Sequence, residues 1–178
     1  MDFDALLEAR RSIRQYAPGH DVTEAQIEEI VAAAVQAPSW KNSQTARYYA
    51  VLSAPLRERF ARECLPEGNA GKSRNAALVV TTFVANTAGF NTEGQPDNEC
   101  GNGWGFYDLG LHNALFLLKA QELGLGTLVM GLRNADAIRS MLHIPESETI
   151  VSVIAVGTAA QSPSKPPRKA VRDILTFY

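Results

Sequence analysis

The stretch AALVVTTFVA, residues 76–85, decides the fold, because it is apolar on both faces of an extended chain and rich in β-branched residues. A strand of this kind is typical of a sheet that other elements cover on both sides. A second stretch, TIVSVIAVG at residues 149–157, has the same character. The two strands together predict a buried sheet at the centre of the domain.

Segments with helical and strand periodicity alternate around these two strands. Thr23 and Gln26 have the spacing of a capping box, and the apolar stripe behind them stops at Pro38, which predicts a helix. Asn134 is the expected N-cap of another helix, and Gly124 the expected end of a third. The remaining periodic segments add helices at residues 4–11, 56–65, 104–123 and 135–142, and strands at residues 48–53 and 127–130. This order predicts one domain over residues 1–178 of the α/β (α+β) class, with helices covering the sheet.

The charge balance is close to neutral, with 17 Lys and Arg against 19 Asp and Glu and a net charge of −2. It argues against a protein that binds nucleic acid or a membrane surface. No run reaches the ~18 apolar residues of a membrane span, and the start MDFDALLEARRS lacks the apolar core of a signal peptide, so we expect a cytoplasmic protein. The two cysteines lack the spacing of a metal site or a disulfide framework; we expect Cys64 in a helix core and Cys100 on a loop.

Two segments fit no regular element. Residues 86–103 are rich in Asn, Gly, Glu and Pro, and a loop of this length is a candidate for a lid or a partner contact. The C-terminal tail begins with prolines and ends on apolar residues that need burial. This burial can come from the chain's own sheet or from another chain.

Two segments resemble known nucleotide-binding motifs but do not fit them. PEGNAGKS at residues 66–73 lacks the first glycine of a phosphate-binding P-loop and precedes a strand instead of following one. GNGWG at residues 101–105 follows a polar loop, so it does not fit a dinucleotide-binding turn. His20, His112 and His143 lie far apart and are expected at the surface or at helix caps. The chain therefore shows no acid–base machinery of its own, which suggests chemistry carried by a bound cofactor.

Arg10, Arg11 and Arg14 crowd into the stretch LEARRSIRQYAPG, residues 6–18. Cations at the end of the first helix are stabilised by its dipole, which accounts for Arg10 and Arg11 without a ligand. Arg14 lies beyond the helix and shares one face of an extended segment with Ser12. Guanidinium groups and a hydroxyl suit a phosphate, so the stretch is a candidate anion site.

A second polar segment is APSWKNSQTARYYAV, residues 37–51, where a turn rich in Ser and Asn precedes a strand. Turns also use such side chains to bond their own backbone. With RRSIRQY, however, it resembles the nitroreductase family, whose motifs run RRSIRxY and APSxxNxQP. The segment GFYDLGLHNALFLLKAQELGLGT, residues 105–127, is similar to that family's central helix, and KPPR at residues 165–168 to its C-terminal basic motif. Thr45 replaces the usual Pro, and residues 86–103 match nothing assigned in the family.

The resemblance implies a nitroreductase-like fold, with a central mixed sheet flanked by helices. It also implies a homodimer with FMN at the interface and a C-terminal segment that extends onto the partner subunit. The tail residues Ile174 to Tyr178 would be buried there.

The implied FMN-binding set takes in most of the motifs quoted above. Arg10, Ser12 and Arg14 would hold the phosphate and ribityl chain, and Lys165 and Arg168 would close the phosphate. Arg11 would contribute a backbone contact only. The residues expected beside the flavin ring are Pro38, Ser39, Asn42, Met130, Gly131 and Leu132. Those expected at its pyrimidine edge are Asn69 and Lys72. The Gly131 amide is the expected donor to flavin N5.

The implied function is that of an FMN-dependent oxidoreductase. NADH or NADPH would deliver hydride to flavin N5, and a nitroaromatic or quinone would then accept it in a ping-pong cycle, with no catalytic side chain and no metal. Two alternatives stay open: a specialised flavoenzyme of the same fold, such as a dehalogenase-, dehydrogenase- or flavin-cleaving-like member, and a flavin-binding module without turnover.

Overall fold

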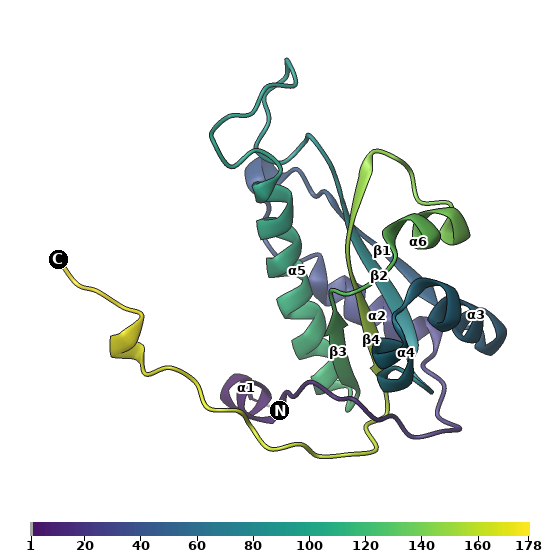
Figure 1. Ribbon diagram of the computed structural model, residues 1–178. Coiled ribbons are helices and arrows are strands. Elements are labelled where there is room, and N and C mark those ends of the chain that lie inside the picture. Colours follow the sequence, from purple (N-terminus) through teal and green to yellow (C-terminus); the bar gives the residue numbers. More distant parts are fainter. Residues whose placement is uncertain (1) are drawn as a thin grey trace.

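A computed structural model describes residues 2–178 and shows a central sheet with helices on both faces (Figure 1). The sheet has four strands in the order β1-β2-β4-β3. Their bounds are Ala46–Val51 for β1, Ala77–Val84 for β2, Gly126–Met130 for β3 and Glu148–Gly157 for β4. The α/β class is therefore confirmed. The expected mixed sheet needs a correction, because all three strand pairs are antiparallel and the parallel contact is a single bridge between Ser12 and Thr127.

The two apolar strands, β2 and β4, are the two central strands of the sheet. β2 pairs with β4 from Ala77 opposite Val156 to Val84 opposite Glu148, with one irregularity between Thr81 and Thr82. Seven of the eight β2 residues are buried, as expected for a strand covered on both faces.

Helices α2 (Glu24–Ala34) and α5 (Gly103–Glu122) cover one face of the sheet, where Ile30 and Phe116 are fully buried. Helices α3 (Ala54–Cys64), α4 (Glu67–Lys72) and α6 (Ala135–Leu142) cover the other, where Phe60, Cys64 and Ile138 are fully buried. The buried position predicted for Cys64 is thus confirmed, and Cys100 is exposed.

The helix ends follow the predicted capping signals. The Thr23 side chain accepts a hydrogen bond from Gln26 N at 3.2 Å, and Gln26 Oε1 accepts one from Thr23 N at 3.0 Å. Asn134 Oδ1 accepts one from Ala137 N at 3.1 Å. Gly124 follows α5 with a φ of +75°, the left-handed conformation expected of a helix end. Three short helices were not predicted: α4, η1 (Trp40–Asn42) and η2 (Val171–Asp173).

The segment that carries the arginines runs from α1 (Phe3–Ala9) along the β3 edge of the sheet. Ile13 N donates to Thr127 O at 2.9 Å, and Ala17 N donates to Thr158 O at 2.9 Å. Gly126 permits the close approach, since a Cβ there would lie 2.5 Å from Ile13 Cγ1. The extended conformation predicted for this segment therefore results from its pairing with the sheet edge.

The long loop and the tail extend from opposite parts of the molecule (Figure 1). The side chains of Asn86 and Asn102 close the base of the loop with a hydrogen bond of 2.9 Å. The tail leaves the body of the molecule, and its last apolar residues are exposed, with Phe177 at 86% and Ile174 at 71%. The alternative in which the tail packs on its own sheet is therefore wrong. Within residues 2–178, no helix combines the length and apolar character needed to span a bilayer.

Candidate functional site

The three N-terminal arginines divide into two kinds. Arg11 is half-buried, and its Nη1 donates to Glu8 O at 2.6 Å and to Arg10 O at 2.8 Å, so this guanidinium satisfies carbonyls at the end of α1. Arg10 and Arg14 form no ion pair with any residue in 2–178, and Arg14 is exposed. Arg10 and Arg14 are therefore the two guanidinium groups still available to an anion.

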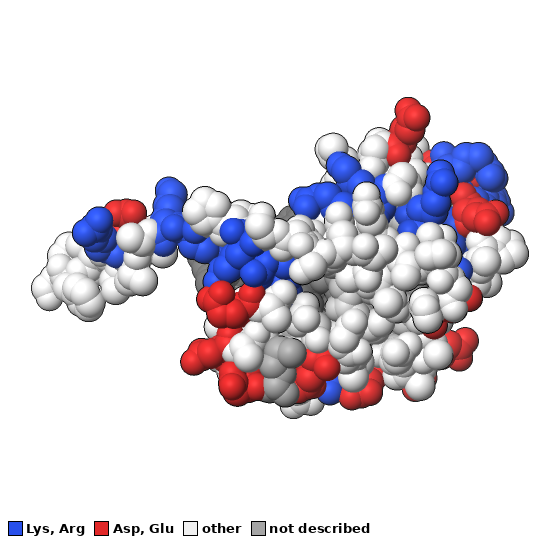
Figure 2. Space-filling view, turned by 90° about the horizontal axis from the view of Figure 1, so that it is seen from below, with Lys and Arg blue, Asp and Glu red and all other residues white. Residues whose placement is uncertain are grey.

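The structure brings the C-terminal basic motif to the same place. Ala160 N donates to Gln15 O at 3.0 Å, and Lys165 forms an ion pair with Glu8 of α1. The hydrogen bond and charge of Lys165 lower the pKa of Glu8. Arg168 is exposed and donates to Pro166 O at 3.0 Å. Figure 2 shows Lys and Arg side chains gathered where the tail leaves the body of the molecule. Lys165 would have to release Glu8 to bind a phosphate, whereas Arg168 forms no ion pair within the described residues.

The backbone that follows β3 is held by two side chains. Arg133 donates to Gly131 O at 2.9 Å and also to Ile150 O on β4. Asn69 Nδ2 donates to Leu132 O at 2.8 Å, so α4 is attached to the same turn. Gly131 and Leu132 are exposed, whereas the Met130 side chain is buried in the core and leaves only its backbone for a ligand. No sequence motif marks Arg133 as a residue of the site.

Helix α4 presents Lys72 beside this turn. The segment that resembles a P-loop folds into helix α4 over Glu67–Lys72. Lys72 lies in the last turn, is exposed, and forms no ion pair with the residues the structure describes. Asn69 precedes it by three positions, which puts both residues on one face of the helix.

The polar turn with Pro38, Ser39 and Asn42 lies elsewhere. It is fixed near the start of α5, where Trp40 N donates to the buried Asp108 carboxylate at 2.8 Å. Arg11 and the C-terminal end of α5 at Gln121 line a common hollow at the other end of that helix. At about 1.5 Å per residue, Asp108 and Gln121 are about 20 Å apart. One chain therefore does not bring this turn together with Arg10 and Arg14.

A buried polar pair on α5 is the main feature the sequence did not reveal. His112 Nδ1 lies 2.8 Å from Asp108 O, and His112 is 3% exposed. The expectation that His112 is a surface or capping residue is wrong, because this face of α5 packs on the rest of the domain. No cluster of metal-ligating side chains exists within residues 2–178.

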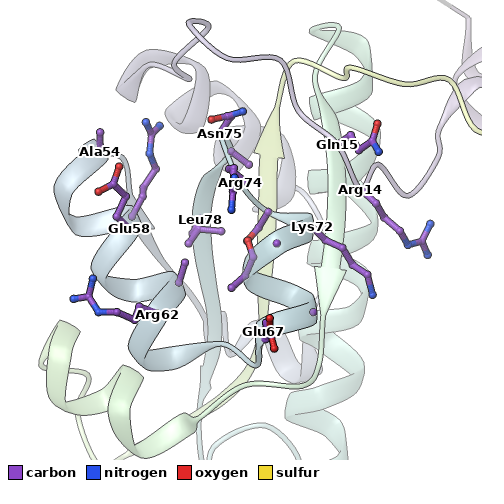
Figure 3. A pocket seen from close by; sticks show the side chains of 17 residues that line it. Arg14, Gln15, Ala54, Glu58, Arg62, Glu67, Lys72, Arg74, Asn75 and Leu78 are labelled. Atoms are coloured by element: carbon purple, nitrogen blue, oxygen red, sulfur yellow. The ribbon is translucent and has the colours of Figure 1, made fainter.

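A cavity of about 890 Å³ opens between α3 and α4 (Figure 3). Arg14 and Lys72 line it, so it borders the candidate anion site. Three further cations that belong to no recognised sequence motif line it as well: Arg57, Arg62 and Arg74. The cavity exists because two helices distant from the N-terminal arginines pack beside them, and no local sequence pattern signals that packing.

Comparison with known proteins agrees with the fold. Residues 7–158 match the Nitroreductase family, and the chain belongs to this family.

Three relatives illustrate the match. MhqN of Bacillus subtilis strain 168, which carries the name of an NAD(P)H nitroreductase, is 23% identical over 99% of this chain and 98% of its own length. A nitroreductase from Exiguobacterium sibiricum, solved in complex with FMN, is 20% identical, with a TM-score of 0.82 over 100% of this chain and 98% of that chain. A solved oxidoreductase containing FMN is 25% identical, with a TM-score of 0.80 over 99% of this chain and 91% of that chain.

Proposed function

We propose that this protein is an FMN-dependent oxidoreductase that takes electrons from NADH or NADPH and passes them to an electron-poor acceptor such as a nitroaromatic or a quinone. Family membership and the FMN-containing relatives support this function. The observation that carries it is the pair Arg10 and Arg14, which lie beside the basic tail with no carboxylate partner within residues 2–178.

The residues present fit the FMN phosphate. Arg10, Arg14 and Arg168 have guanidinium groups without ion-pair partners in the described chain, and Ser12 adds a hydroxyl between the first two. Bound FMN would supply the hydride chemistry, since no side chain here is arranged for acid–base catalysis.

Other residues would tune the flavin. Lys72 would stabilise negative charge on the pyrimidine edge by Coulomb attraction. The Gly131 amide would donate to N5, and the hydrogen bonds from Arg133 and Asn69 would hold that backbone in place.

We also infer a homodimer with FMN at its interface. The turn with Pro38, Ser39 and Asn42 and the arginine segment lie by opposite ends of α5, about 20 Å apart along the helix, so a second chain would supply the turn to the same flavin. The exposed apolar end of the tail, including Ile174 and Phe177, offers surface that binding to a partner would remove from water.

The test begins with the purified protein. FMN absorbance should accompany it, and NADH or NADPH added without oxygen should bleach that absorbance. A protein that refuses added FMN would contradict the cofactor. A yellow protein that neither nucleotide bleaches would indicate a flavin-binding module or a member with another donor.

Arg14→Ala tests the anion site directly. We expect FMN affinity to fall at least tenfold, since a charge-assisted hydrogen bond contributes ~1.5–3 kcal/mol. The free energy of unfolding should change little because Arg14 is exposed. Arg59→Ala is the matched control, because Arg59 is also exposed but pairs with Glu63 on α3. Equal FMN affinity in the two variants would contradict a role for Arg14 in binding FMN.

A further inference from the structure

The cavity between α3 and α4 has the size and form of a ligand site. Its volume of about 890 Å³ lies within the ~300–1,000 Å³ usual for small-molecule pockets. Leu78, on the buried strand β2, is seen between the two helices in Figure 3 and lines the cavity with Ala61 and Ala76. The cavity thus combines a small apolar surface with a polar rim.

The rim has an excess of positive charge. Arg14, Arg57, Arg62, Lys72 and Arg74 line the cavity, against two carboxylates, Glu58 and Glu67. Arg62 pairs with Glu63 at 3.0 Å, outside the lining. Arg74 is exposed and forms no ion pair within the described chain.

Arg57 contributes a guanidinium to the cavity lining that is paired on one side only. One of its terminal nitrogens pairs with Asp21 at 2.6 Å. The other, Nη1, is buried and has no hydrogen-bond partner within residues 2–178. A buried guanidinium N–H without an acceptor is unfavourable, and the Arg57 guanidinium adds to the cations that line the cavity.

The cavity borders the proposed FMN site without being that site. Arg14 and Lys72 belong to both, whereas Arg10, Ser12 and Gly131 do not line the cavity. A molecule held here would therefore lie next to the flavin. The electron donor must place its nicotinamide against the flavin, and its phosphates need cations close by.

We propose that the α3–α4 cavity binds the phosphate groups of the nicotinamide dinucleotide donor, with Arg74 and Arg62 as the residues that serve only this ligand. This inference rests on the proposed function. Arginine suits the role because its planar fork donates two parallel hydrogen bonds to a phosphate. The alanines and Leu78 give the adenosine half an apolar surface to cover.

Steady-state kinetics of the FMN-loaded protein tests this proposal with two kinds of donor. Arg74→Ala and Arg62→Ala should each raise the KM for NADPH about tenfold, the loss expected for one charge-assisted hydrogen bond. With 1-benzyl-1,4-dihydronicotinamide, which has no phosphate, kcat/KM should stay at the wild-type value. Arg59→Ala removes the same charge from the exposed side of α3, outside the cavity. It should leave the KM for NADPH and the kcat/KM for the phosphate-free donor at their wild-type values.

Calorimetry separates this proposal from the proposed function. NADP⁺ titrated into the FMN-loaded protein should bind more weakly to Arg74→Ala than to the wild type, whether or not any donor reduces the flavin. The inference would be overturned if Arg74→Ala bound NADP⁺ as tightly as the wild type. It would also be overturned if the variant lost as much kcat/KM with the phosphate-free donor as with NADPH. Inorganic pyrophosphate should compete with NADPH but not with the phosphate-free donor. Arg74-dependent binding of pyrophosphate that leaves NADPH kinetics untouched would assign the cavity to a free anion and overturn the dinucleotide role.

Discussion

Gly105 offers a sharp test of the packing between α5 and the sheet. A Cβ at this position would lie 2.3 Å from Phe83 Cδ2 and 2.4 Å from Phe83 Cε2. Phe83 is 1% exposed and packs edge-on against Phe106, so its ring has little room to move. Overpacking of this kind costs ~1–3 kcal/mol, and the higher helix propensity of Ala returns at most ~1 kcal/mol. We expect Gly105→Ala to lower the free energy of unfolding by about 1–2 kcal/mol.

Gly110, one and a half turns further along α5, is the matched control. Nothing lies within 4 Å of a Cβ built there, so Gly110→Ala should raise the free energy of unfolding by about 0.5–1 kcal/mol. Urea unfolding followed by circular dichroism measures both values, and size-exclusion chromatography checks that the two variants keep the wild-type oligomeric state. In thermal unfolding, Gly105→Ala should lower the midpoint by about 5 °C. A Gly105→Ala variant as stable as Gly110→Ala would show that Phe83 moves aside freely and would refute the reasoning.

Three further predictions concern a helix cap, a buried thiol and the turn after β3. Thr23→Ala removes the acceptor of the Gln26 N–H and should cost about 1 kcal/mol in urea unfolding, whereas Thr23→Ser should cost much less. Burial raises the pKa of the Cys64 thiol from 9.0 to about 11, so its contribution to stability is complete below pH 9 and is lost as the pH rises to 11. The fall in unfolding free energy between these pH values should be smaller in Cys64→Ala. Arg133→Gln should shift the reduction potential of bound FMN, measured by dye equilibration, because it frees the Gly131 carbonyl; an unchanged potential would limit Arg133 to a structural role.

Periodicity was sufficient for the elements whose burial pattern is simple. β2 and β4 are apolar on both faces, and α2 carries both a capping box and an apolar stripe, so local sequence and tertiary packing favour the same structure. The predicted bounds differ from the observed ones by a few residues at most. The sheet's antiparallel order depends on contacts between distant strands, which no local pattern encodes.

Helix α4 escaped prediction for a physical reason. It contains Gly68 and Gly71, each of which disfavours a helix by about 1 kcal/mol relative to Ala. A tertiary contact compensates, because Asn69 donates to Leu132 O at 2.8 Å. At the end of the helix, the Ser73 hydroxyl also donates to Asn69 O at 2.9 Å. A segment whose helix depends on such contacts looks like a loop in the sequence.

In the site, too, residues that lie close together in the sequence could be predicted, whereas residues that only tertiary packing brings together could not. The arginine cluster was visible because its members lie within five positions, and Arg11 behaves as the helix dipole predicts. The cavity cations Arg57, Arg62 and Arg74 were not singled out, since each looks like an ordinary surface residue until α3 packs beside α4. Asp108 and His112 were missed because a buried polar residue in an amphipathic helix has no distinctive sequence context.

The two polar motifs that identify the family are held at opposite ends of α5, and this separation constrains how they can act. Trp40 is bonded to Asp108 near the start of the helix, whereas Arg11 lies by Gln121 near its end. The intervening stretch is a continuous α-helix of about 20 Å, so no loop movement brings the motifs together in one chain. Both motifs would lie beside one flavin if a second copy supplied the turn. The exposed apolar tail points to the same requirement, because it contacts no core of its own. Separation along α5 and exposure of the tail are therefore two independent structural reasons for one inference, a flavin site completed by a partner chain.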